Sequence, residues 1–123
     1  MAIEKTTLVL GASRNPDRVA YQAIKSLKKR DIHVIAIGNK DFEDDEFKII
    51  TGMPPDIGPV HTIALYLGPS KQAEYYDYII SLHPVRIIFN PGTQNPELEK
   101  IAYKHGIEVV EGCMLVMLKT GQF

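Results

Sequence analysis

Hydrophobic and polar residues follow one another along this chain in two different patterns. Short, continuous apolar runs rich in β-branched residues are typical of strands buried on both faces of a sheet. Such runs occupy residues 8–10, 32–37, 47–50, 62–67, 86–89 and 107–110. Longer stretches whose apolar positions recur every three or four residues predict helices. They occupy residues 16–30, 70–82, 95–105 and, more briefly, 113–118.

The strands and helices alternate, and this order predicts the fold class. It favours a parallel sheet with right-handed crossover connections and helices on both faces. We therefore expect an α/β protein with a doubly wound parallel sheet of five or six strands, in three layers α/β/α. Because parallel strands end at the same edge of the sheet, the loops that follow them should form a ligand crevice beside the first strand.

Two asparagine–proline pairs predict where helices begin. Asn15-Pro16 and Asn95-Pro96 each combine a side chain that caps helical amides with a residue suited to the first helical position. Both helices are therefore expected to start at their proline. In the first of them, Val19, Ala23 and Leu27 should face the core.

The remaining segments give simpler expectations. In the stretch 70–82, Ala73, Tyr76 and Ile80 fall on one helical side. Residues 41–46 hold five acids and are most simply a solvated loop. Residues 51–59, with three prolines and two glycines, should be irregular.

Composition narrows the class of protein. A length of 123 residues predicts one domain over residues 1–123, and 45% apolar with 24% charged residues is typical of a globular protein. The net charge of −1 gives no reason to expect a nucleic acid or an anionic membrane as partner. No apolar run approaches the roughly 18 residues of a membrane helix, and the start has no signal-peptide pattern. From these two features we expect a cytoplasmic protein. The one cysteine, Cys113, excludes an intrachain disulfide and cannot alone make a zinc site, and we expect no metal.

The loop that follows the first strand is the first candidate for chemistry. Gly11, Ala12 and Ser13 connect a buried strand to a helix, so free backbone amides and the helix dipole both favour an anion there. The dinucleotide fingerprint G-x-G-x-x-G would need glycines at 11, 13 and 16, and the chain has serine and proline at the last two. The loop therefore predicts a phosphate site that differs from the usual one for NAD.

The end of the second strand points to the kind of nucleotide. An acid is expected there to hold the ribose hydroxyls of NAD, but the chain reads Gly38-Asn39-Lys40. A lysine cannot accept a hydroxyl hydrogen, whereas it can pair with a phosphate. The residues thus favour a nucleotide with an extra phosphate, and on this argument alone NADP is as acceptable as other such nucleotides.

Several segments together resemble the small stand-alone coenzyme A-binding proteins, which are similar to the CoA-binding domain of the succinyl-CoA synthetase alpha subunit. The matching segments span nearly the whole chain, in order. They are 11–16, Tyr21, Leu27, 33–35, Asn39-Lys40, 87–92, 95–98, Ala102, 106–107, 109–110 and Cys113. The resemblance implies a Rossmann-like fold that binds coenzyme A through its ADP portion.

Site residues follow from the resemblance by position. It implies that the backbone of Gly11, Ala12 and Ser13 and the Ser13 hydroxyl hold the pyrophosphate, with Arg14 or Arg18 adding positive charge. The simpler alternative for a helix-start arginine is that it is only solvated.

The resemblance also assigns the flanks of the site. It places Lys40 near a phosphate and Asn39 near the adenosine, although a surface lysine and a turn asparagine are the plain alternatives. Tyr66 and Leu67 would flank the nucleotide or the pantetheine, with core packing at a strand end as the alternative.

Chemistry beyond binding has two weak candidates. Cys113 follows the last strand and would lie at the ligand edge, as a buried structural thiol or as a nucleophile near the CoA sulfur. The segment Asn90-Pro91-Gly92 is most simply a turn, and the alternative is that it positions a thioester or a partner loop. The leading hypothesis is a non-catalytic module that binds CoA or an acyl-CoA. One alternative is a CoA- or NADP-using enzyme, with Cys113 or an oligomer interface supplying the chemistry. The other is a docking subunit for a separate ligase-type partner. A homodimer or a protein partner would be compatible with these hypotheses.

Overall fold

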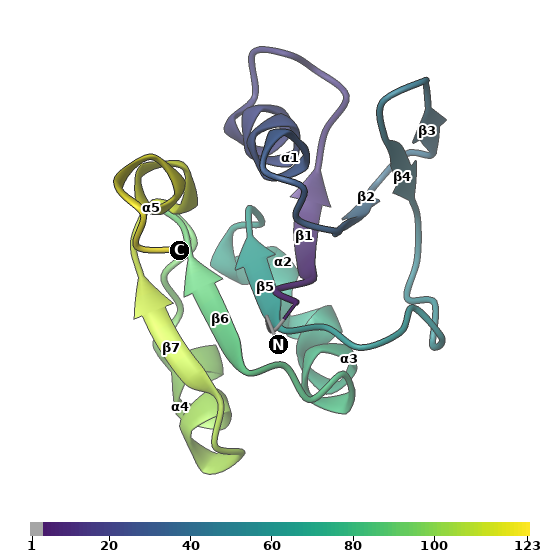
Figure 1. The fold of residues 1–123 in the computed structure, drawn as a ribbon. Coiled ribbons are helices and arrows are strands. Elements are labelled where there is room, and N and C mark those ends of the chain that lie inside the picture. The colour runs from purple at the N-terminus through teal and green to yellow at the C-terminus, as the bar shows by residue number, and fades with distance from the viewer. Residues whose placement is uncertain (1–3) are drawn as a thin grey trace.

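The structure is a computed structural model that describes residues 4–123, and a single sheet runs through it (Figure 1). Its order is β3-β4-β2-β1-β5-β6-β7, and every neighbouring pair is parallel except β3 with β4. The strands are β1 Thr7–Ala12, β2 Val34–Gly38, β3 Phe42–Glu43, β4 Lys48–Ile50, β5 Thr62–Leu65, β6 Arg86–Phe89 and β7 Glu108–Glu111. The helices are α1 Val19–Lys29, α2 Pro69–Gln72, a 3₁₀ turn Ala73–Tyr75, α3 Tyr76–Ser81, α4 Pro96–Lys104 and α5 Met114–Thr120.

Alternate residues of each strand face two separate hydrophobic cores. On one face, Leu8 and Leu10 pack in a cluster with Ile79 of α3 and Leu98 of α4. On the other face, Val9 packs in a cluster with residues of α1 and α5. This period-two alternation between buried faces confirms the expected three-layer, doubly wound, Rossmann-like fold (Figure 1).

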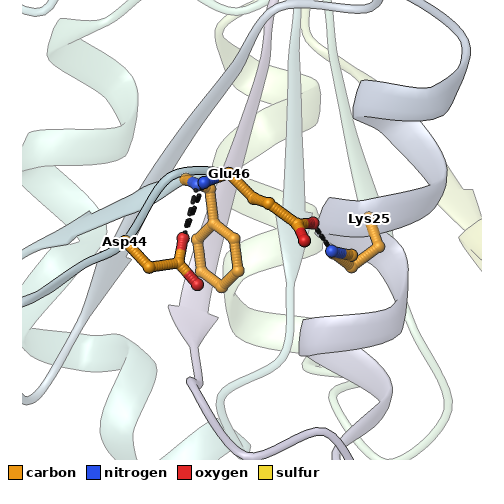
Figure 2. Close-up of polar contacts among 4 residues, drawn as sticks. Lys25, Asp44 and Glu46 are labelled. Atoms are coloured by element: carbon orange, nitrogen blue, oxygen red, sulfur yellow. Dashed lines mark hydrogen bonds and ion pairs between the residues drawn. The ribbon is translucent and has the colours of Figure 1, made fainter.

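The sheet has one strand more than the upper expectation of six. The acidic segment 41–46 is not only a solvated loop, because Phe42–Glu43 form β3, which pairs antiparallel with β4. The turn between them is held by Asp44, whose carboxylate accepts from the amides of Glu46 at 2.8 Å and Phe47 at 3.0 Å (Figure 2). Glu46 also forms an ion pair with Lys25 of α1 (Figure 2). A two-residue edge strand has too few apolar positions to be seen in the sequence.

Two helices differ from the expectation. The stretch 70–82 is not one helix but α2, a 3₁₀ turn and α3, and Ala73 is exposed rather than on the buried side. The buried polar residue there is Gln72, whose amide nitrogen donates to the carbonyls of Leu67 at 2.9 Å and Thr93 at 2.8 Å. These two hydrogen bonds connect the end of α2 to the loops after β5 and β6.

The first helix starts later than expected. α1 begins at Val19, three residues after Pro16, and Val19 itself is 48% exposed. Ala20 takes the buried position, beside Ala23 and Leu27. By contrast, α4 starts at its proline with Asn95 as the cap, as expected. No helix within residues 4–123 is both long and apolar enough to cross a membrane.

Candidate functional site

A cleft of about 1060 Å³ lies where the strand order reverses, at the carboxyl ends of β2, β1 and β5. The chain runs from β1 outward to β2 and β4, then returns to β5 on the other side of β1, so the loops diverge at this point. Nine of the residues expected to bind a ligand line the cleft. They are Gly11, Ala12, Ser13, Arg14, Arg18, Asn39, Lys40, Tyr66 and Leu67.

Two glycines let these three loops approach one another closely. A Cβ on Gly11, which has φ +101°, would lie 2.9 Å from the backbone carbon of Tyr66. A Cβ on Gly38 would lie 2.5 Å from the carbonyl oxygen of Ala12. Both distances are shorter than real Cβ contacts, so a side chain at either position would push the loops apart.

The segment between β1 and α1 forms one wall of the cleft. The expected cap does not form, because Asn15 Oδ1 accepts from the amide of Asp17 at 3.0 Å in a turn before the helix. Arg18 is instead the N-cap residue, and its side chain makes no capping hydrogen bond. The delayed start places Arg14 and Arg18 on the cleft wall, where both side chains are exposed.

Backbone amides at this wall are left without acceptors. Within residues 4–123, the N–H groups of Ser13, Arg14, Val19 and Ala20 donate no hydrogen bond. The Ser13 hydroxyl oxygen accepts from the amide of Asn15 at 3.1 Å, which leaves its hydrogen free to donate. Free amides at a helix N-terminus together with a hydroxyl donor suit a phosphate group.

The opposite wall is formed by the residues after β2. Asn39 and Lys40 are both exposed and line the cleft. Within residues 4–123 the Lys40 ammonium forms no ion pair. Lys40 thus stands where the NAD site needs an acid, and its contact with an extra phosphate stays a prediction.

Tyr66 and Leu67, which follow β5, lie partly in the cleft and partly in the core. Tyr66 packs against the α1 and α5 face, and Leu67 against the other face. Burial raises the pKa of Tyr66, and the nearby Cys113 raises it further, so the phenol is neutral at pH 7. The Tyr66 hydroxyl is buried and has no hydrogen-bond partner within residues 4–123. Core packing of both residues is therefore observed, and their expected position beside a ligand stays a prediction.

Three expected residues do not line the cleft. The Asn90 side chain is used inside the fold, since its nitrogen donates to the carbonyl of Leu65 at 3.0 Å and its oxygen accepts from the amide of Met114 at 2.9 Å. Gly92 is exposed beyond it, and its amide donates to Gln94 Oε1 at 3.0 Å. Cys113 is half-buried and is the N-cap residue of α5.

The cleft is also lined by residues that the sequence did not indicate as binding residues, among them Asp17, Ser70, Lys71, Glu74 and Tyr75. Four of these five follow β5, in a stretch expected to be only an amphipathic helix. Its proximity to the loop after β1 follows from the pairing of β1 with β5, which no local pattern shows. Within residues 4–123, no cluster of three or more His, Cys, Asp or Glu side chains is placed to hold a metal ion.

Comparison with known proteins identifies the family. The model of the CoA binding domain matches residues 5–119. The chain belongs to the CoA-binding domain family. This places the free amides and cations of the cleft in a module of CoA-binding type. None of the curated proteins compared with this chain matches it.

Solved structures share the fold of this CoA-binding domain. The crystal structure of an uncharacterized protein is 46% identical, has a TM-score of 0.93, and is matched over 99% of this chain and 100% of that one. A hypothetical protein from Pyrococcus horikoshii OT3 is 25% identical, with a TM-score of 0.85 over 95% of this chain and 83% of that one.

A larger enzyme contains a similar fold. The dinucleotide-forming acetyl-coenzyme A synthetase 1 of Ca. Korarchaeum cryptofilum, solved with phosphate and ADP, is 20% identical with a TM-score of 0.67. The match covers 85% of this chain but 25% of that protein. At this identity the likeness concerns the fold alone.

Proposed function

We propose that this domain binds coenzyme A, or an acyl-CoA, in the cleft at the ends of β2, β1 and β5, as a non-catalytic binding or regulatory module. The observation that carries the proposal is the open N-terminus of α1. Its amides, the Ser13 hydroxyl and the side chains of Arg14 and Arg18 all border the cleft. A pyrophosphate there would receive hydrogen bonds from groups that have no acceptor within residues 4–123.

Lys40 supports CoA over NAD as the ligand. At the end of β2 it would meet a ribose phosphate, which CoA carries and NAD does not. Asn39 beside it would contact the adenosine, while Tyr66 and Leu67 would flank the nucleotide or the pantetheine. NADP also carries an extra phosphate, so the experiment has to separate the two.

The two phenols of the cleft that have a raised pKa support a role without catalysis. Tyr66 and Tyr75 line it, and burial raises the pKa of both phenols further above neutrality. A general acid or base works best with a pKa near the operating pH, and these shifts move the phenols away from it. Cys113 lies outside the lining, which supports a structural thiol over a nucleophile.

Titration calorimetry with CoA, acetyl-CoA, dephospho-CoA, NAD and NADP tests the ligand. We expect CoA to bind more tightly than dephospho-CoA and NAD, because of these three ligands CoA alone offers Lys40 a ribose phosphate. Tighter binding of NADP than of CoA would overturn the proposal that CoA is the ligand, while the cleft would still be a nucleotide site. Binding of none of the five would overturn the proposed function.

A cysteine variant tests the non-catalytic part. Cys113→Ser is expected to bind CoA as the parent does, since Cys113 does not line the cleft. Thioester hydrolysis or acyl transfer by the parent protein with acetyl-CoA, lost in this variant, would show that the domain is an enzyme.

A further inference from the structure

The cleft has a second free cation, on the side of the loop after β1 opposite to Lys40. Lys71 belongs to α2, which follows β5, and its exposed side chain lines the cleft. Glu74, three residues later, lines the cleft as well. Within residues 4–123 the Lys71 ammonium forms no ion pair, with Glu74 or any other acid. A cation that pairs with no acid of the described residues is available to a ligand.

The strand order fixes where Lys71 lies relative to the other cations. β2, β1 and β5 are neighbours in that order, so Lys40 and Lys71 flank the loop of β1 from opposite sides. The loop after β5 also lies close to the glycine loop, since a Cβ on Gly11 would lie 2.9 Å from the backbone carbon of Tyr66. An anion held by the amides at the start of α1 would therefore have Arg18 on the α1 side and Lys71 on the β5 side.

We propose that the two lysines divide the phosphates of the ligand, with Lys71 binding the pyrophosphate of CoA and Lys40 its ribose 3′-phosphate. This assignment rests on the proposed function. In doubly wound folds the residue after the second strand faces the ribose, and the pyrophosphate lies at the helix N-terminus beside the first strand. Lys40 has the first position and Lys71 borders the second.

Two ligands and two variants separate these roles. Dephospho-CoA keeps the pyrophosphate and lacks the 3′-phosphate. Lys71→Gln is expected to weaken CoA and dephospho-CoA by the same factor, roughly tenfold for a lost contact between a lysine and a phosphate. Lys40→Gln is expected to weaken CoA by a similar factor and to leave dephospho-CoA unchanged. Calorimetric dissociation constants give all four values.

Two controls complete the experiment. Lys100→Gln removes an exposed lysine of α4 that lies outside the cleft and should change neither affinity. Lys71→Arg keeps the positive charge and should retain most of the binding. Equal melting temperatures for the parent and all variants would show that the losses are not due to unfolding.

The outcomes distinguish the two proposals. Unchanged binding of both ligands by Lys71→Gln, with the parent binding CoA, would overturn the role of Lys71 alone. If Lys71→Gln weakened the binding of CoA but not of dephospho-CoA, Lys71 would contact the 3′-phosphate. That result would overturn the assignment of the pyrophosphate to Lys71. A parent protein that binds neither ligand would overturn the proposed function and this assignment with it.

Discussion

The helices α1 and α4 both follow an asparagine–proline pair, and their N-termini are built in opposite ways. At α4, Asn95 is buried and its oxygen accepts from the amides of Glu97 at 3.1 Å and Leu98 at 3.4 Å. At α1, the equivalent Asn15 is exposed and caps a separate turn, which leaves the helical amides free.

The two helix starts also differ in the acidic side chains of their first turns. The first turn of α4 holds Glu97 and Glu99, whose negative charges suit the positive end of the helix dipole. The first turn of α1 holds no acid. The fold thus satisfies one helix N-terminus from within and leaves amides of the other without acceptors within residues 4–123. The shared dipeptide does not reveal this difference, and the open start is the one that the proposed function assigns to the ligand.

Asn95→Ala should have the largest effect on stability. It removes the cap, and it also removes the donor to Gln72 Oε1 at 2.9 Å and to the Tyr76 hydroxyl at 2.8 Å. A lost cap and an unpaired buried acceptor together cost about 3 kcal/mol. Urea unfolding measures the change. Asn15→Ala, at an exposed position, should change stability by less than about 0.5 kcal/mol, and equal losses in the two variants would contradict the comparison.

Capping α1 artificially should move stability and binding in opposite directions. Arg18→Ser places a capping hydroxyl at an N-cap residue that already has extended backbone angles, and should stabilise the protein by about 0.5–1 kcal/mol. It should also weaken CoA binding, because the serine would occupy amides that the phosphate uses.

Arg18→Gln is the matched control for this experiment, since it removes the charge without a strong cap. We expect CoA to bind roughly threefold more weakly to the serine variant than to the glutamine variant. A serine variant that is more stable yet binds CoA as the glutamine variant does would show that the α1 amides do not contact the ligand.

The smallest expected effect on stability concerns Glu99 of α4 and the neighbouring Glu111 of β7. Burial raises the pKa of Glu99 above its usual 4.5, and Glu111 at the end of β7 raises it further. A raised carboxyl pKa contributes stability below about pH 4.5 that is lost as the pH rises through the folded-state value. Glu111→Gln should therefore reduce the loss of stability that occurs as the pH rises above about 4.5.

At pH 7 the same change should raise the melting temperature by about 1–2 °C, because it relieves one like-charge pair. Scanning calorimetry at several pH values follows both effects. CoA affinity should not change, since Glu111 lies outside the cleft. A melting temperature of Glu111→Gln that falls at pH 7 would contradict the repulsion.

Local patterns in the sequence were sufficient for the layers of the fold and for much of the cleft. Continuous apolar runs indicated six of the seven strands, since strands buried on both faces have few alternatives. The small residues after β1 and the lysine after β2 indicated a phosphate site, because strand ends in a parallel sheet gather at one edge. The start of α4 was also confirmed, since Asn95 caps it locally.

Long-range contacts decided the rest. The sequence could not distinguish Asn15 from Asn95, because only packing against Gln72 and Tyr76 buries the second asparagine. It could not show that the Asn90 side chain forms hydrogen bonds with both β5 and α5. It also could not show that Lys71 lines the same cleft as the loop after β1. These facts depend on which strands become neighbours. The local sequence predicts the structure that each segment favours by itself. Strand pairing and burial determine which polar groups find partners inside the fold and which have none.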